Sequence, residues 1–226
     1  MKKVITFDFS MLNFFKALNA NKEKVKDPKR QHLGYIYFDA KNSCFVATDG
    51  KVLIKVNATG ENMISQFEGQ SAFCTLMNDS TLIAEDTYNG TDSQYVDYAR
   101  VIPNVEKNYD RYNIPDMKKN WGINKKYVPF MVNQLISREA DTIYNPEFFD
   151  RAKDIIGYMT VAFYPHIETW EEEEARLEAE KGMSVEERNN AKERRKNLRY
   201  MPTVLMSQDE TITYVIMPIG EEGEGK

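Results

Sequence analysis

Histidine and cysteine are scarce in this chain of 226 residues. The two histidines, His32 and His166, have no further histidine or cysteine at the short spacings of a zinc site. The two cysteines, Cys44 and Cys74, lie in apolar stretches, where we expect small buried side chains and no disulfide. The sequence therefore predicts no metal centre and offers few groups for enzymatic chemistry.

Carboxylates are plentiful, but their placement does not fit catalysis or cofactor binding. Most paired glutamates lie between residues 166 and 200, where solvation gives no reason for the shifted pKa of a general acid or base. The stretch Asp110–Asp116 lacks the regular spacing of a calcium loop. The tail Gly220–Lys226 matches the start of a phosphate-binding loop, but it lacks the following Ser or Thr and its glutamates repel phosphate. We expect no cofactor and no enzymatic activity.

The sequence also lacks a long apolar run and a secretory leader. No stretch approaches the roughly 18 apolar residues that span a bilayer, and an alternating segment follows Met1-Lys2-Lys3 directly. We therefore expect a soluble, cytoplasmic protein without membrane contact. The net charge of -5 and the pI near 5.3 are unfavourable for binding nucleic acid when the charge is taken over the whole chain. They do not exclude such binding, because a basic inner surface can coexist with an acidic outer one.

Apolar periodicity predicts an α+β protein built from two related units. In the first unit, residues 1–103, a strand at 4–9 precedes an amphipathic helix capped by Ser10. Residues 104–120 show only weak periodicity, so we place the boundary near Pro103. Further strands of the first unit are expected at 33–39, 44–56, 71–77, 81–85 and 98–102.

The second unit, residues 104–226, repeats the order of the first. Asn145-Pro146 is a cap followed by the residue favoured at the first helical position, and Gly157 ends the expected helix. Strands follow at 158–164, 202–206 and 211–217. The shared order, a helix followed by antiparallel strands, indicates two related domains.

Residues 166–200 interrupt the second unit with charges of both signs. Glutamates dominate the first part, arginine and lysine dominate the second, and Gly182 separates the two. Ser184-Val185-Glu186-Glu187 has the spacing of a capping box for a second helix. We expect an inserted charged helical hairpin whose arms pair through opposite charge. It could be a solvated insertion or a partner site.

Three separated segments carry a family resemblance. Residues 45–53 (FVATDGKVL) look like a VATDGHRL signature, residues 95–103 (YVDYARVIP) like FPDYRRVIP, and residues 214–219 (YVIMPI) like YVVMPM. In this order they resemble the bacterial sliding clamp, the beta subunit of DNA polymerase III. Residues 145–149 (NPEFF) are similar to the helix start before the last sheet of that family. Segments 104–140 and 166–200 have no counterpart.

The resemblance implies two clamp-type (DNA clamp) domains, with helices lining a ring and antiparallel sheets outside. The family builds its ring from six such domains, so two domains per chain imply a homotrimer. The implied function is that of a sliding clamp, a DNA polymerase processivity factor that encircles duplex DNA without reading its sequence. The implied partners are duplex DNA, a DNA polymerase and a clamp loader.

In the bacterial family, partner peptides bind in an apolar cleft between the middle and last domains. The matching positions here are Leu33, Thr48, Gly50, Lys51, Val52, Leu53, Val96, Arg100, Val101, Val215, Met217, Pro218 and Ile219. Lys51, Val52 and Val96 differ from the family's residues, which implies a different peptide preference. Because successive side chains of a strand point to opposite faces of the sheet, about half of the apolar residues in this set could belong to the protein core instead of the cleft.

Basic residues on or near the predicted helices are the candidates for facing DNA, and each could equally be a solubilising charge. They are Lys16, Lys22, Lys24, Arg151 and Lys153. Two other functions stay open. One is a clamp-fold adaptor or regulatory protein that binds partners through the charged hairpin without encircling DNA. The other is a small nucleic-acid-processing enzyme with a carboxylate-bound metal.

Overall fold

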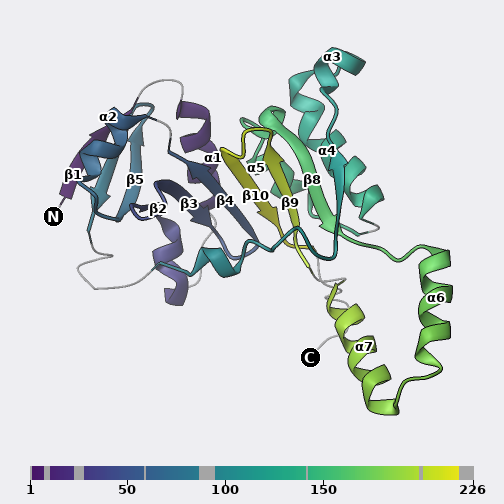
Figure 1. Cartoon of the computed structure of the whole chain (residues 1–226). Helices are drawn as coiled ribbons and strands as arrows, with labels where there is room; N and C mark the ends of the chain where they lie inside the picture. The colour runs from purple at the N-terminus through teal and green to yellow at the C-terminus, as the bar shows by residue number, and fades with distance from the viewer. Residues whose placement is uncertain are drawn as a thin grey trace.

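The computed structural model describes residues 2–7, 11–22, 28–58, 60–86, 95–140, 142–198 and 201–218. Over these residues, ten strands form one antiparallel sheet in the order β1-β6-β5-β2-β3-β4-β10-β9-β8-β7 (Figure 1). Helices pack against one face of this sheet. The predicted α+β class is confirmed. Ser10, the predicted cap of the first helix, lies outside the described residues.

The first half of the chain forms one end of the sheet. In α1, Phe15 and Leu18 are buried against the strands while Lys16 between them is exposed, the pattern of an amphipathic helix. The elements are β1 (Lys2–Thr6), α1 (Leu12–Lys22), η2 (Pro28–Gly34), β2 (Ile36–Asp39), β3 (Cys44–Thr48), β4 (Val52–Asn57), α2 (Glu61–Ile64), η3 (Ser65–Phe67), β5 (Ala72–Asn78) and β6 (Thr81–Glu85).

The second half forms the other end. Its helix α5 begins as predicted, because the Asn145 side chain accepts the backbone N–H of Glu147 and Pro146 occupies the first turn. The elements are η4 (Tyr98–Arg100), β7 (Tyr109–Asn113), α3 (Met117–Trp121), η5 (Lys125–Tyr127), α4 (Val128–Glu139), α5 (Pro146–Arg151), η6 (Ile156–Tyr158), β8 (Met159–Pro165), α6 (Trp170–Glu180), α7 (Val185–Leu198), β9 (Thr203–Ser207) and β10 (Ile212–Ile216).

The two halves share one sheet because β10 pairs with β4. The strands run antiparallel from Ile212 opposite Val56 to Ile216 opposite Val52. One apolar core lies on the helix-covered face and contains side chains from α1, α4, α5 and strands of both halves. Sheet and core thus continue across the junction, and the boundary near Pro103 stays a prediction.

Several elements differ from the sequence-based expectation. The stretch 44–56, predicted as one strand, is the β3–β4 hairpin. Residues 98–100 form a 3-10 helix, so the strand predicted at 98–102 is wrong. The helix predicted to reach Gly157 ends at Arg151, although the apolar residues after it remain buried in turns. Strand β7 and helices α3 and α4 lie within residues 104–140, where the sequence predicts no element.

The inserted segment forms the helices α6 and α7, which project from the sheet (Figure 1). Ser184 caps α7 as predicted, because its backbone N–H donates to the Glu187 carboxylate at 2.8 Å and its hydroxyl accepts the Glu187 N–H. The two arms are splayed in Figure 1. Arg176 on α6 forms ion pairs with Glu168, just before that helix, and with Glu180 at its end, so both partners belong to the same arm. The predicted pairing of the arms is not found among the described side chains.

His166 ties the root of the hairpin to the edge strand β7. Its Nδ1 lies 2.8 Å from Asp110 Oδ2, and its Nε2 lies 3.1 Å from Glu172 Oε2. The hydrogen bond to Asp110 raises the pKa of His166 above its usual 6.5, partial burial opposes this, and the bond to Glu172 adds to it. The protonated imidazole can donate to both carboxylates at once.

We expect the His166 ring to titrate above pH 6.5, with the midpoint moving back toward that value in Asp110→Asn. Because the folded pKa is raised, the bridge contributes fully to stability below about pH 6.5 and this contribution is lost as the pH rises through the raised value. NMR titration of the imidazole protons measures the midpoint, and His166→Gln assigns the resonance. A midpoint that Asp110→Asn leaves unchanged would contradict the bridge.

Cys44 and Cys74 are both buried and free, as predicted. Burial raises the pKa of each thiol, so neither is suited to nucleophilic chemistry. None of the helices in the described part of the chain is long and apolar enough to cross a bilayer.

Candidate functional site

Residues 48–52 form a tight turn between β3 and β4. Oδ1 of Asp49 accepts the backbone N–H groups of Lys51 and Val52 at 2.9 and 3.0 Å, and the Thr48 hydroxyl donates to the Val52 carbonyl at 2.6 Å. Gly50 has a φ of +88°, which favours glycine, and a Cβ there would lie 3.1 Å from the Arg30 guanidinium. The Thr-Asp-Gly part of the family-like segment is therefore explained by turn geometry.

Asp49 also joins the two halves through a buried ion pair. Its Oδ2 accepts a hydrogen bond from the Arg151 guanidinium on α5, and the two side chains are only 6% and 8% exposed. The guanidinium carbon lies 5.5 Å from the centroid of the Phe148 ring. Arg151 is thus not available to a DNA phosphate, and its predicted DNA-facing role is wrong. Helical spacing alone does not show which residue of another element a side chain meets.

Four of the predicted cleft residues lie together on the sheet face opposite the helices. Thr48 is directly opposite Leu53, and Leu53 is directly opposite Val215. Residues directly opposite one another point to the same face, and Leu33 packs against this row from η2. All four are buried. The first and last family-like segments therefore meet across three neighbouring strands.

The other predicted cleft residues are more dispersed. Val52 faces the helix-covered core, so its place in the cleft is wrong, because successive strand residues point to opposite faces. The backbone N–H of Met217 donates to the Lys51 carbonyl at 3.0 Å, which holds Met217 beside the turn. Ile219 lies outside the described residues. Val96, Met217 and Pro218 are half-buried, and Gly50, Lys51, Arg100 and Val101 are exposed.

The linker between the halves, residues 95–107, covers part of the same face. Tyr95 stacks on Tyr37 with ring centroids 4.7 Å apart, and the Tyr98 hydroxyl donates to Asp39 at 2.6 Å. Burial alone would raise the pKa of Asp39, but hydrogen bonds from Tyr98 and then Asn42 hold it below its usual value. These tyrosine anchors were not among the predicted site residues. The feature of the sequence that could have indicated them is the occurrence of two aromatic residues close together in a polar stretch.

An open cavity of about 430 Å³ lies beside the linker on this face. Lys55, Thr213 and Met206 line it from β4, β10 and β9, where they are directly opposite one another. This row is two residues further along the strands than the row of Leu53 and Val215. Linker residues such as Ile102 and Val105 add apolar lining. The mixture of apolar and polar groups suits side chains of an extended peptide.

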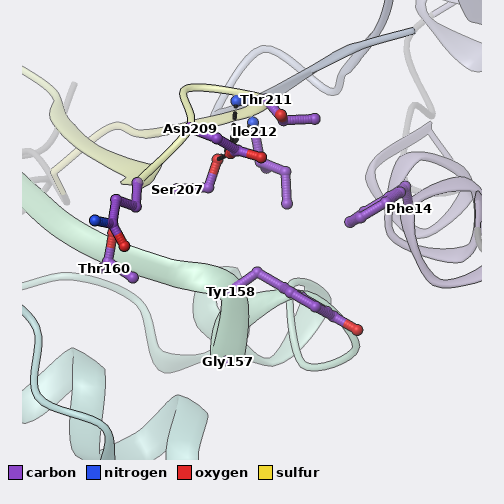
Figure 2. Close-up of a pocket in the computed structure, with 9 residues that line it drawn as sticks. Phe14, Gly157, Tyr158, Thr160, Ser207, Asp209, Thr211 and Ile212 are labelled. Atoms are coloured by element: carbon purple, nitrogen blue, oxygen red, sulfur yellow. Dashed lines mark hydrogen bonds between the residues drawn. The ribbon is translucent and has the colours of Figure 1, made fainter. Parts of the chain in front are cut away.

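A second cavity, of about 520 Å³, lies where α1 approaches η6 and the β9–β10 turn (Figure 2). Phe14 and Tyr158 meet edge to face across it, with ring centroids 5.7 Å apart. Hydrogen bonds from Ser207 and Thr211 lower the pKa of Asp209 to about 2. Asp209 is the only ionisable carboxylate among the lining residues, which include no histidine or lysine. This cavity therefore lacks an acid–base pair.

No protein-family model matches the chain, and no curated protein matches it. The chain resembles solved bacterial sliding clamps. A DNA polymerase III subunit beta from Bartonella birtlesii, bound to griselimycin, aligns at 12% identity and a TM-score of 0.46 over 96% of this chain and 66% of that chain. The sliding clamp of Bacillus subtilis aligns at 10% identity and a TM-score of 0.49 over 96% and 64%. The chain thus spans less than two thirds of these clamps.

The helix-covered face carries two of the predicted DNA-facing lysines in exposed positions. Lys16 lies on α1, and Lys153 lies in the turns that follow α5. The Lys22 side chain and the whole of Lys24 lie outside what the structure describes. Within the described residues, no group of three or more His, Cys, Asp or Glu is arranged to hold a metal ion. The exposed lysines can attract phosphates, but they form no catalytic arrangement.

Proposed function

We propose that this chain is a sliding clamp, a non-enzymatic processivity factor that encircles duplex DNA and tethers a DNA polymerase. The observation that carries the proposal is the convergence of three family-like segments. The turn at 48–52, the linker at 95–103 and strand β10 with the following Met217 all meet on the sheet face opposite the helices. One face is thus left for DNA and the other for partners. The proposed place of action is the cytoplasm.

DNA would lie against the helix-covered face. A clamp has to attract phosphates without base-specific contacts, because such contacts would stop it from sliding. Lys16 and Lys153 are exposed on or beside helices that contact each other on this face. Their attraction would be summed over the subunits of the ring, which makes a net acidic chain compatible with DNA binding.

Replacing Lys16 and Lys153 together with glutamate should weaken DNA association on the order of tenfold at low salt. It should also reduce the steepness of the salt dependence, because fewer counterions are released. Fluorescence anisotropy with a labelled duplex at several salt concentrations measures both quantities. Lys41→Glu/Lys107→Glu, which reverses two exposed lysines in the β2–β3 turn and at the end of the linker, is the matched control with the same change in charge. Equal effects of the two variants would show that the helix face is not the DNA face.

The partner face would receive an extended peptide of the polymerase or of the clamp loader. Met217 and Pro218 are half-buried beside the turn at residues 48–52. They lie near Leu53 and Val215, the buried pair on neighbouring strands β4 and β10. The open cavity at Lys55, Met206 and Thr213 continues the same face. Apolar and methionine side chains suit the docking of several different anchor residues.

Met217→Asp should weaken binding of the polymerase that copies the same genome on the order of 30-fold or more. The substitution places a charge at the position where an apolar anchor residue of the partner peptide would be buried. Surface plasmon resonance with the immobilised chain measures this loss. Met183→Asp, at the exposed turn of the hairpin, controls for a general effect of charge. Unchanged polymerase binding by the Met217 variant would remove this surface from the proposal.

A ring requires contacts between copies at the two ends of the sheet. β1 pairs only with β6, and β7 pairs only with β8, so each offers a free edge in the described structure. A free edge is a template for a strand of another chain. Pairing of β1 with β7 of the next copy would continue the sheet head to tail, and such contacts form rings when the rotation closes. We propose three copies, each supplying two clamp-type domains.

A further inference from the structure

The hairpin leaves apolar side chains of both arms in water. Trp170 and Leu177, seven residues apart on α6, are 70% and 50% exposed, and Val185 at the start of α7 is 68% exposed. None of them belongs to either apolar cluster of the body. Such a group on a projecting element is typical of an interaction surface.

The arms carry opposite charge around these apolar residues. Over Trp170–Glu180, α6 has six glutamates and one arginine, a net charge of -5. Over Val185–Leu198, α7 has five basic and three acidic residues, a net charge of +2. On α6, helical spacing puts Glu174 on the same face as Trp170 and Leu177. On α7, it puts the basic residues Arg188 and Lys192 on the same face as Val185. Each arm therefore combines exposed apolar side chains with a net charge, negative on α6 and positive on α7.

This pattern fits a second hairpin better than it fits a polyanion. Nucleic acid near α7 would also meet the glutamates of α6, which repel phosphate. A hairpin from a second copy presents a basic arm to the acidic arm and an acidic arm to the basic arm. Such a contact is self-complementary, as a two-fold interface requires. The arms are splayed within one chain (Figure 1), and most of their described side chains are exposed, so both arms are accessible to a second copy.

We propose that the hairpin is a self-association element, in which α6 of one copy packs against α7 of a second copy and the reverse. The contact buries Trp170, Leu177 and Val185 and sets opposite charges against each other. It is separate from the sheet-edge contacts of the proposed ring. In a trimeric ring it would join two rings, and in a chain that forms no ring it would make a dimer.

Two charge-reversed variants test this directly. In Glu171→Lys/Glu174→Lys/Glu178→Lys, both arms become positive, and in Arg188→Glu/Lys192→Glu/Arg195→Glu, both arms become negative. We expect each variant alone to lose hairpin association at least tenfold, because like charges then face each other. A mixture of the two should associate at least tenfold more tightly than either alone, with the gain decreasing as salt screens the charges. Sedimentation velocity measures all three samples.

Several outcomes would overturn the proposal. Variants that associate as the unmodified chain does, or a mixture that gains nothing, would show that the hairpin does not pair with a second copy. Loss of DNA binding by the negative variant with unchanged self-association would make α7 a nucleic-acid arm instead. A chain in which residues 168–199 are replaced by a short Gly-Ser turn separates the two proposals. Its mass should fall to that of one ring if the ring exists, and to one chain if only the hairpin self-associates.

Discussion

Arg151→Met should lower the free energy of unfolding by about 3–5 kcal/mol. The substitution keeps much of the aliphatic volume but removes the guanidinium that pairs with Asp49. The carboxylate then remains at a site where its side chain is 6% exposed, and among the described residues the backbone N–H groups of Lys51 and Val52 are its remaining hydrogen-bond partners. Because the pair joins the β3–β4 turn to α5, the loss should be accompanied by loosening of the junction. Urea denaturation measures the free energy, and hydrogen exchange at β4 and β10 locates the effect.

The matched control is Arg100→Met, which removes an exposed ion pair. Arg100 bonds to Asp97 at 2.8 Å with its side chain 87% exposed, and such surface pairs contribute about 0–1 kcal/mol. The double variant Asp49→Asn/Arg151→Met should be less destabilised than the sum of its single changes, because no uncompensated charge remains. If Arg151→Met behaves like Arg100→Met, the ion pair does not hold the two halves together.

Val4→Asp should dissociate the proposed ring, leaving single chains or pairs of chains joined by their hairpins, with association through the sheet edges weakened on the order of a hundredfold. Val4 lies in the free edge strand β1 and is 62% exposed, although it is apolar. Contact with another copy would explain that exposure, and a carboxylate there would be desolvated without a partner. Circular dichroism should stay unchanged, because the side chain makes little contact with the chain's own core.

Met77→Asp is the control for this variant. Met77 is 59% exposed on β5, a strand with neighbours on both sides. We expect it to keep the mass of the unmodified chain in light scattering. Equal masses for the two variants, whether both assembled or both single chains, would show that the β1 edge is not the specific contact between copies.

The predictable parts of the fold are those encoded in short stretches of sequence. The alternating strands, the Asn145 cap and the Ser184 capping box each depend on residues only a few positions apart. Strand β7 is harder to predict, because it is a short edge strand with three half-buried and two exposed residues and no buried one, so it lacks a strong alternation. The α4 helix, by contrast, has Pro129 in its first turn and buried Val132 and Ile136 four residues apart, which are local signals from which it could have been predicted.

The site was predictable in its segments but not in its side-chain directions. The turn signature and the last strand do meet, because β4 and β10 pair. Whether Val52 or Leu53 faces the partner side depends on strand register, which neighbouring strands set. Likewise, Arg151 is a surface-like residue in sequence, and only the packing of α5 against the turn shows that it is buried with Asp49. The aromatic anchoring of the linker at Tyr37 is also a contact between distant residues.

The most direct test of the central claim is the mass of the chain in solution at micromolar concentration and low salt, measured by native mass spectrometry. A clamp ring built from this 26.3 kDa chain should have three copies, or six if hairpins join two rings. A single chain that stays at 26.3 kDa, with or without duplex DNA, would contradict the ring and favour an adaptor that acts through its hairpin.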